Sequence, residues 1–187
     1  QVCKLVKKRA NGAPLAYLVG HKEFFGLDFA VNQRVLIPRP ETEILVEEVL
    51  KELVHLQTCK LAYYIDVGTG SGCIPIAIAK TMKQFNNRTI KTFATDISKS
   101  ALRIAKINTK KHRVKINFLH GNLLAPFLKS YNLTPKTYNL IITANLPYLT
   151  PKQYKNSPSI QHEPKSALVA GKTGLELYKK LLLQIKN

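Results

Sequence analysis

The part of the chain that most constrains the fold lies between residues 61 and 83. Residues 61–67 form an apolar run of strand length, residues 66–72 read Asp-Val-Gly-Thr-Gly-Ser-Gly, and residues 71–83 follow with a helical pattern. In a strand–turn–helix unit, glycines let the backbone approach an adenosine-bearing ligand closely. The spacing is Gly-x-Gly-x-Gly rather than the Gly-x-Gly-x-x-Gly of dinucleotide enzymes, which favours a smaller adenosine ligand. The alternative is a tight strand–helix connection with no ligand.

Further strand-like and helical segments alternate along the chain. Residues 89–95, 114–119 and 138–144 predict strands, and residues 99–111 and 175–185 predict helices. Alternation of strands with helices indicates an α/β domain with a parallel sheet. Because ligands bind beyond the carboxyl ends of such strands, we expect the functional residues to follow the strands directly.

Two of these strand ends carry candidate cofactor ligands. Asp96 closes the second strand, 24 residues beyond Gly72, where a carboxylate can accept hydrogen bonds from both ribose hydroxyls. Its alternative role as a helix cap is weaker because Ser98 already caps the helix over 99–111. After the third strand, Asn122 can accept from an adenine amino group and Leu123 can pack on the ring. The alternative at this third position is an ordinary polar loop.

The fourth strand ends in Asn145-Leu146-Pro147-Tyr148. The Asn145 side-chain oxygen and the Leu146 carbonyl can each accept one hydrogen of a planar NH2 group. Pro147 stiffens the turn and Tyr148 offers a flat face for stacking. The tetrapeptide therefore predicts a site that holds a planar nitrogen group.

The first 60 residues contribute a hairpin and a helix. Residues 1–20 contain a basic run and a turn. In residues 21–37 apolar and polar residues alternate, which predicts a hairpin with Gly26 at the turn and residues 35–37 as its last extended part. Pro38-Arg39-Pro40-Glu41-Thr42-Glu43 then enters a helix with an apolar stripe over residues 45–54. Taken alone, this entry is a rigid helix start with an Arg–Glu surface pair. Residues 150–174, with three prolines, predict an ordered functional loop.

Composition limits the kinds of site and partner. The three cysteines are far apart and form no Cys-x-x-Cys pair, which indicates reduced thiols in an intracellular protein without a zinc site. No apolar run reaches the roughly 18 residues that a membrane helix needs. The net charge of +18 indicates either a polyanionic partner or compositional drift, and we favour drift because 23 of the 29 basic residues are lysines. We likewise interpret the basic face of the helix over 99–111 as solvated; it comprises Lys99, Arg103, Lys106 and Lys110.

Taken together, these motifs resemble the release-factor glutamine methyltransferases, which use S-adenosylmethionine to methylate a glutamine side-chain amide. Residues 35–43, Val-Leu-Ile-Pro-Arg-Pro-Glu-Thr-Glu, are the most specific match. The cofactor turn at 66–72 and the segments around Glu163-Pro164 and Gly174-Leu175 match as well, in the same order. The chain departs from the family at Leu146, where the family usually has proline, and at Asn122 and Asn139, where it often has aspartate. Asn-Leu-Pro-Tyr is also typical of ribosomal RNA adenine dimethyltransferases.

The resemblance implies a fold and a division of the chain. The fold is a Rossmann-like class I methyltransferase sheet without its C-terminal strands, preceded by a β-hairpin linker. Residues 1–37 are expected to be that linker, following a missing N-terminal helical domain. Residues 38–187 are expected to be a C-terminally truncated S-adenosylmethionine-dependent methyltransferase domain.

The resemblance also implies the activity, which is transfer of a methyl group from S-adenosylmethionine to the glutamine of the Gly-Gly-Gln loop of a peptide chain release factor. The alternatives are an N6-adenine methyltransferase on RNA or DNA and a non-catalytic, basic RNA- or ribosome-binding fragment. We expect a monomer in the cytoplasm, or in an organelle, with no metal and no membrane. The implied catalytic residues are Asn145, Leu146, Pro147 and Tyr148. The implied cofactor-binding residues are Gly68, Thr69, Gly70, Ser71, Gly72, Asp96, Asn122, Leu123 and Asn145. The implied substrate-binding residues are Pro38, Arg39, Glu41, Asn145, Pro147 and Tyr148.

Overall fold

A parallel β-sheet forms the centre of the molecule. The computed structural model of the chain describes residues 2–55, 62–84, 90–131 and 139–186. Within these ranges the sheet consists of β3 (Ala62–Val67), β4 (Ile90–Asp96), β5 (Asn117–His120) and β6 (Asn139–Ala144), in the order β5-β4-β3-β6. The chain thus runs outward from β3 to β5 and then returns to the other side of β3. The predicted α/β fold with a Rossmann-like sheet is confirmed.

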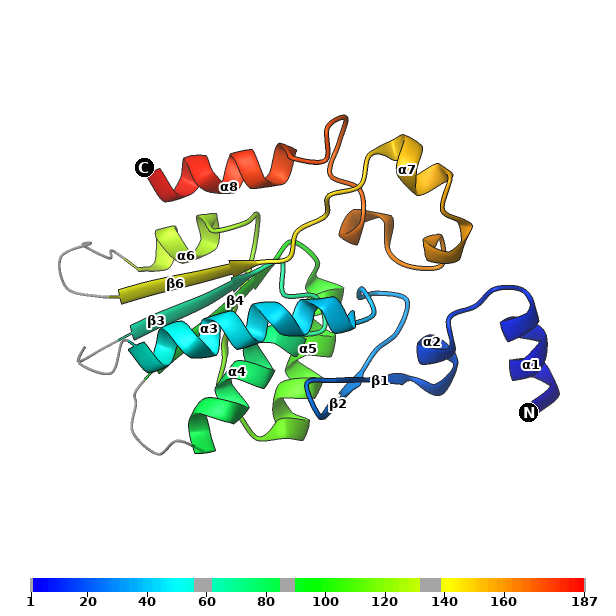
Figure 1. Ribbon diagram of the computed structural model, residues 1–187, viewed down its shortest axis with the longest axis horizontal. Coiled ribbons are helices and arrows are strands. Elements are labelled where there is room, and N and C mark those ends of the chain that lie inside the picture. The colour runs from blue at the N-terminus through cyan, green and yellow to red at the C-terminus, as the bar shows by residue number, and fades with distance from the viewer. Residues whose placement is uncertain (1, 56–61, 85–89, 132–138, 187) are drawn as a thin grey trace.

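Helices cover both faces of this sheet (Figure 1). α3 (Glu43–His55), α4 (Cys73–Gln84) and α5 (Lys99–His112) lie on one face, and α6 (Ala125–Ser130) and α8 (Glu176–Lys186) lie on the other. The side chains of β3 alternate between the two layers, because successive strand residues point to opposite faces. Tyr64 packs with α3 and α4, whereas Tyr63 and Ile65 pack with α6 and α8.

The N-terminal part consists of α1 (Val2–Ala10), α2 (Leu15–Val19) and the antiparallel hairpin of β1 (His21–Phe24) and β2 (Leu27–Ala30). The hairpin turn is Phe25-Gly26, and both residues have positive φ, 52° and 68°. This is the two-residue turn whose twist matches that of the flanking strands. Phe24 and Phe29 are buried against α3 and α4, so the predicted hairpin is confirmed and belongs to the main core.

Two sequence-based strand assignments are wrong. Residues 35–37 form no strand: Val35 and Ile37 are buried, and the Ile37 amide donates to the Glu163 carboxylate at 3.0 Å instead of to a neighbouring strand. The third strand begins at Asn117 rather than at Val114, because Val114 lies two residues beyond α5 and still bonds to its last turn. Its amide donates to the Thr109 carbonyl at 3.3 Å.

Several short helices were not predicted. They are α1, α2, α6, α7 (Pro151–Lys155) and the 3₁₀ turns η1 (Pro40–Thr42), η3 (Pro158–Ile160) and η4 (Lys165–Ala167). Limits were predicted for three longer helices, α4, α5 and α8. Each of them starts and ends within two residues of the predicted limit. The predicted positions 61, 89 and 138 lie outside the described residues, as does Cys59. None of the helices in the described ranges has the length and hydropathy needed to span a membrane.

Candidate functional site

The predicted site residues converge on a cavity at the carboxyl ends of the strands. This cavity, cavity A, has a volume of about 320 Å³. The sequence-predicted residues that line it are Gly68, Gly70, Asp96, Asn122, Leu123, Asn145, Leu146 and Pro147. They lie at or just after the ends of the four strands of the parallel sheet, and they meet because these strands end at one edge.

The glycine turn after β3 presents only part of itself to cavity A. Gly70 has a left-handed φ of 55°, and a Cβ there would meet open space. Thr69 and Ser71 are buried and do not line the cavity. Gly72 packs against α5, where an added Cβ would stand 3.1 Å from the Ala105 side chain. These three residues shape the turn from behind, while Gly70 leaves room for a ligand beside the backbone.

Asp96 links the glycine turn to the start of α5. Its Oδ2 accepts the Gly70 amide at 2.8 Å and its Oδ1 accepts the Ser98 amide at 2.7 Å. Burial raises the pKa of the Asp96 carboxyl above its usual range, and the two backbone donors oppose that rise. Each carboxylate oxygen keeps a further lone pair, so Asp96 can still accept from two vicinal hydroxyls in cavity A. Ser98 also caps α5 as predicted, since its Oγ accepts the Ala101 amide.

The loop after β5 places Asn122 and Leu123 on the wall of cavity A. Leu123 has a left-handed φ of 52°, a conformation that is costly for a branched side chain. Its side chain is buried with Leu124 in the core between the sheet and α8. The turn thus places an apolar side chain and an amide side by side on the wall of cavity A.

The tetrapeptide after β6 lies between cavity A and a second cavity. Asn145 Nδ2 donates to Thr42 Oγ1 at 3.1 Å, and Asn145 Oδ1 accepts no hydrogen bond from the described residues. The Leu146 amide donates to the Tyr178 hydroxyl at 3.2 Å, so α8 fixes the turn from the opposite side. Tyr148 is 62% exposed, and its ring is open to a ligand. The side-chain oxygen of Asn145 is therefore available as an acceptor.

The second cavity, cavity B, has a volume of about 560 Å³ and is lined by residues including Arg39, Glu41, Thr42, Asn145, Leu146 and Tyr148. It shares Leu36, Asn145, Leu146 and Ala167 with cavity A. Pro147 lines cavity A alone, and Pro38 lines neither cavity. The two cavities therefore meet at Asn145 and Leu146.

Arg39, which lines cavity B, has a structural partner behind it in Glu163. Its guanidinium pairs with Glu163, which is 5% exposed and also accepts the Ile37 amide. Because two donors satisfy the buried carboxylate, the pair ties residues 37–39 to the loop before η4. Arg39 therefore lines the cavity with its charge already paired.

Sequence reasoning missed three residues that shape this site, namely Thr42, Glu163 and Tyr178. Thr42 and Glu163 lie inside recognised motifs, but their partners Asn145 and Arg39 are more than 100 residues away in the chain. Tyr178 looks like one more residue of an amphipathic helix. Among the described residues, no group of three His, Cys, Asp or Glu side chains is arranged to hold a metal ion.

Comparison with known proteins gives one family match and many curated relatives. Residues 60–170 match the family model described as "Methyltransferase domain". The chain is 34% identical over 186 residues to a release factor glutamine methyltransferase of Bacillus anthracis, covering 98% of this chain and 62% of the relative. It is 41% identical over 183 residues to the protein of that name from Coxiella burnetii, covering 97% of this chain and 60% of the relative. The chain thus spans about three fifths of the length of these relatives.

Among solved structures, the chain is similar to the hMettl16 catalytic domain in complex with MAT2A 3'UTR hairpin 1. The TM-score is 0.57 and the sequence identity 20%, and the match covers 91% of this chain and 61% of that chain. At this identity the similarity concerns the fold, and it agrees with the parallel sheet described above.

Proposed function

This chain belongs to the methyltransferase-domain family, and we propose that it methylates the glutamine of the Gly-Gly-Gln loop of a peptide chain release factor. The methyl donor in this proposal is S-adenosylmethionine, and the acceptor is the side-chain amide nitrogen. The names and identities of the curated relatives support this substrate.

Cavity A fits the adenosine part of the donor. Gly70 leaves open space beside the backbone, and Asp96 retains lone pairs for the two ribose hydroxyls. Asn122 and Leu123 stand on the same wall, where the adenine amino group and ring face are expected. When bound, S-adenosylmethionine supplies a methyl carbon that its sulfonium makes electrophilic.

The observation that carries the proposal is the junction of the two cavities at Asn145 and Leu146. A donor in cavity A and a side chain entering through cavity B meet there. Asn145 Oδ1 and the Leu146 carbonyl can accept the two hydrogens of a primary amide, and Tyr148 can stack on the amide plane.

The residues at this junction make a poor nucleophile reactive chiefly by position. An amide nitrogen is weakly nucleophilic because its lone pair is delocalised into the carbonyl. Two fixed oxygen acceptors orient that nitrogen and favour the positive charge that develops on it. Alignment of this kind can supply several of the roughly 7–11 kcal/mol available from proximity and orientation. No side chain need act as a general base, since the proton can leave to water after transfer.

The relatives' names favour glutamine over the two alternatives, an N6-adenine methyltransferase and a non-catalytic RNA- or ribosome-binding fragment.

We further propose that residues 38–187 form the methyltransferase domain, with residues 1–37 as its linker. We also propose that the protein acts as a monomer where translation terminates, in the cytoplasm or an organelle.

Mass spectrometry of the substrate tests this proposal. The full chain is incubated with S-adenosylmethionine and a release factor, and in parallel with RNA. We expect one added methyl group on the Gly-Gly-Gln glutamine, and none on a release factor in which that glutamine is alanine. Methylated adenine in the RNA, or an unmodified release factor with the cofactor bound, would overturn it.

A further inference from the structure

α5 carries a stripe of cations along its exposed face. Lys99, Arg103, Lys106 and Lys110 follow one another at spacings of four, three and four residues, and all are exposed. At 3.6 residues per turn, these positions fall within a sector of about 60° and extend over about 17 Å. The opposite side of α5 is buried in the core. The stripe is thus a straight row with about one cation per helical turn.

These cations have no counter-ions close by. No ion pair to Lys99, Arg103, Lys106 or Lys110 forms among the described residues, whereas Lys111 on the same helix pairs with Asp28. Residues 97–162 contain eleven lysines and arginines and not one aspartate or glutamate. In the part of the chain that the structure describes, Asp28 on β2 and Asp96 at the start of α5 are therefore the acidic residues that contact this helix, and neither forms an ion pair with the stripe.

The acidic residues collect on a different helix of the same layer. Glu43, Glu47, Glu48 and Glu52 lie on α3, and α4 packs against both α3 and α5. Compositional drift would scatter the excess lysine without regard to the fold. Four of the eleven acidic residues lie on α3 and none lies on α5, so these two helices of one layer differ in the sign of their charge.

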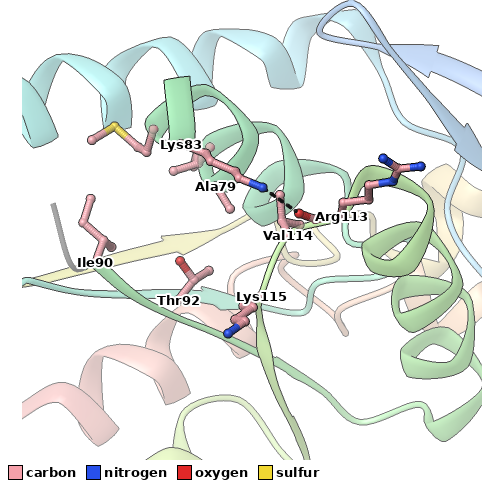
Figure 2. Close-up of a pocket in the computed structure, with 9 residues that line it drawn as sticks. Ala79, Lys83, Ile90, Thr92, Arg113, Val114 and Lys115 are labelled. Carbon is pink, nitrogen blue, oxygen red and sulfur yellow. Dashed lines mark hydrogen bonds between the residues drawn. The ribbon is translucent and has the colours of Figure 1, made fainter. Parts of the chain in front are cut away.

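The positive surface continues past the end of α5. Arg113 follows the helix at its C-cap and is exposed. Lys83 Nζ donates to the Arg113 carbonyl at 3.5 Å, and Lys83 and Lys115 border a cavity of about 310 Å³ beside it (Figure 2). At the other end, Ser98 and Ala101 line cavity A next to Lys99. The stripe thus runs from the rim of cavity A along the molecule.

We propose that this stripe binds the phosphodiester backbone of a nucleic acid, which replaces the interpretation of α5 as a merely solvated face. Regularly spaced, unpaired cations match a chain of phosphates, whose neutralisation releases counter-ions. Lysine is depleted in protein–protein interfaces, which disfavours an acidic protein. A membrane surface is disfavoured because the apolar face of α5 lies in the core and is not free to insert. The inference does not depend on the substrate proposed above.

The chain contains a matched control for this surface. The test variant carries Lys99→Gln, Arg103→Gln, Lys106→Gln and Lys110→Gln. The control carries Lys4→Gln, Lys7→Gln, Lys8→Gln and Arg9→Gln on α1, which is also exposed. Both remove three lysines and one arginine from a helix surface, so they differ only in place. Circular dichroism of both variants serves to check that they are folded before binding is measured.

Fluorescence anisotropy measures binding of a labelled RNA hairpin, and of a DNA hairpin of equal length, from about 50 to about 200 mM salt. The slope of log K against log salt is negative, and its magnitude increases with the number of phosphate contacts. For the test variant we expect this magnitude to decrease by about 3, since each lost phosphate contact removes about 0.7–0.9. The control should lose less than about 1. The RNA and DNA arms show which of the two backbones binds more tightly.

Equal losses in the two variants would mean that diffuse net charge causes the binding and would overturn the proposal. So would failure of the unaltered chain to bind either hairpin at the lowest salt. Poly-glutamate at equal charge concentration serves as the protein-like competitor. Displacement of the RNA by poly-glutamate as efficiently as by unlabelled RNA would reassign the surface to acidic proteins.

Discussion

Asp96 accepts the backbone amide of Gly70 at 2.8 Å, and this bond joins the end of β4 to the glycine turn after β3. The residue expected to bind ribose therefore also holds the turn that makes room for the ligand. The Asp96 carboxylate therefore has two roles: it is the expected ligand of the ribose, and it holds the glycine turn that borders cavity A.

Asp96→Ala should weaken the binding of S-adenosylmethionine, because it removes the ribose acceptor and the anchor of Gly70 together. A hydrogen bond to a charged group contributes about 1.5–3 kcal/mol, so we expect the Kd to rise by about one to two orders of magnitude. Isothermal calorimetry measures it, with Asp28→Ala as a control at an exposed carboxylate remote from cavity A. An unchanged Kd for Asp96→Ala would reject the ribose assignment.

Thr42 should act as a positioning residue for Asn145. Its hydroxyl accepts from Asn145 Nδ2, which leaves Oδ1 to face the substrate. We expect Thr42→Val to lower kcat by about tenfold, equivalent to about 1.4 kcal/mol, with little change in cofactor affinity. Thr42→Ser keeps the hydroxyl and should restore most of the activity.

The double variant separates positioning from general stability. If Thr42 acts through Asn145, adding Thr42→Val to Asn145→Ala should cause little further loss, since residues that act as a unit are non-additive. Full additivity, or failure of Thr42→Ser to restore activity, would show that Thr42 has only a structural role.

Asp66 should make stability depend on pH. It is 1% exposed and accepts from the Thr143 hydroxyl at 2.8 Å, and burial raises its pKa to about 6. The folded protein therefore holds a proton that the unfolded chain has released above its lower, ordinary pKa. The protonated Asp66 carboxyl therefore contributes to the free energy of unfolding. This contribution is fully present below the ordinary pKa and is lost as the pH rises through about 6, by up to about 3 kcal/mol.

Asp66→Asn carries no such charge, so its advantage over the unaltered chain should grow between about pH 4 and pH 7. Urea denaturation at several pH values measures the difference in the free energy of unfolding. A difference that stays constant over this range would show that folding does not raise the pKa of Asp66.

The sequence predicted those parts of the fold that local patterns determine. The apolar strands before Gly68, Asp96, Asn122 and Asn145 could be placed, and a parallel sheet puts the ends of such strands at one edge. The residues after them do meet in cavity A. The alternating pattern gave a wrong prediction at residues 35–37. Val35 and Ile37 are buried as in a strand, but the Ile37 amide donates to the Glu163 carboxylate instead of to a neighbouring strand.

Contacts across the chain could not be predicted in this way. Thr42 and Asn145 are 103 residues apart, and Tyr178 reaches Leu146 across 32 residues. No periodicity in either segment reports such a pairing, because it arises only when β6, η1 and α8 pack together. The motif also did not reveal that Thr69 and Ser71 are buried and line no part of cavity A.

In the proposed reaction, Asn145 holds an amide nitrogen where cavity A meets cavity B. The most direct test is the single-turnover rate of methyl transfer to a release factor by Asn145→Ala at saturating cofactor, with Asn11→Ala as an exposed control. Loss of one preorganised hydrogen-bonding group predicts a fall of about 10²–10³-fold with cofactor affinity largely unchanged. A near-normal rate for Asn145→Ala would contradict the account.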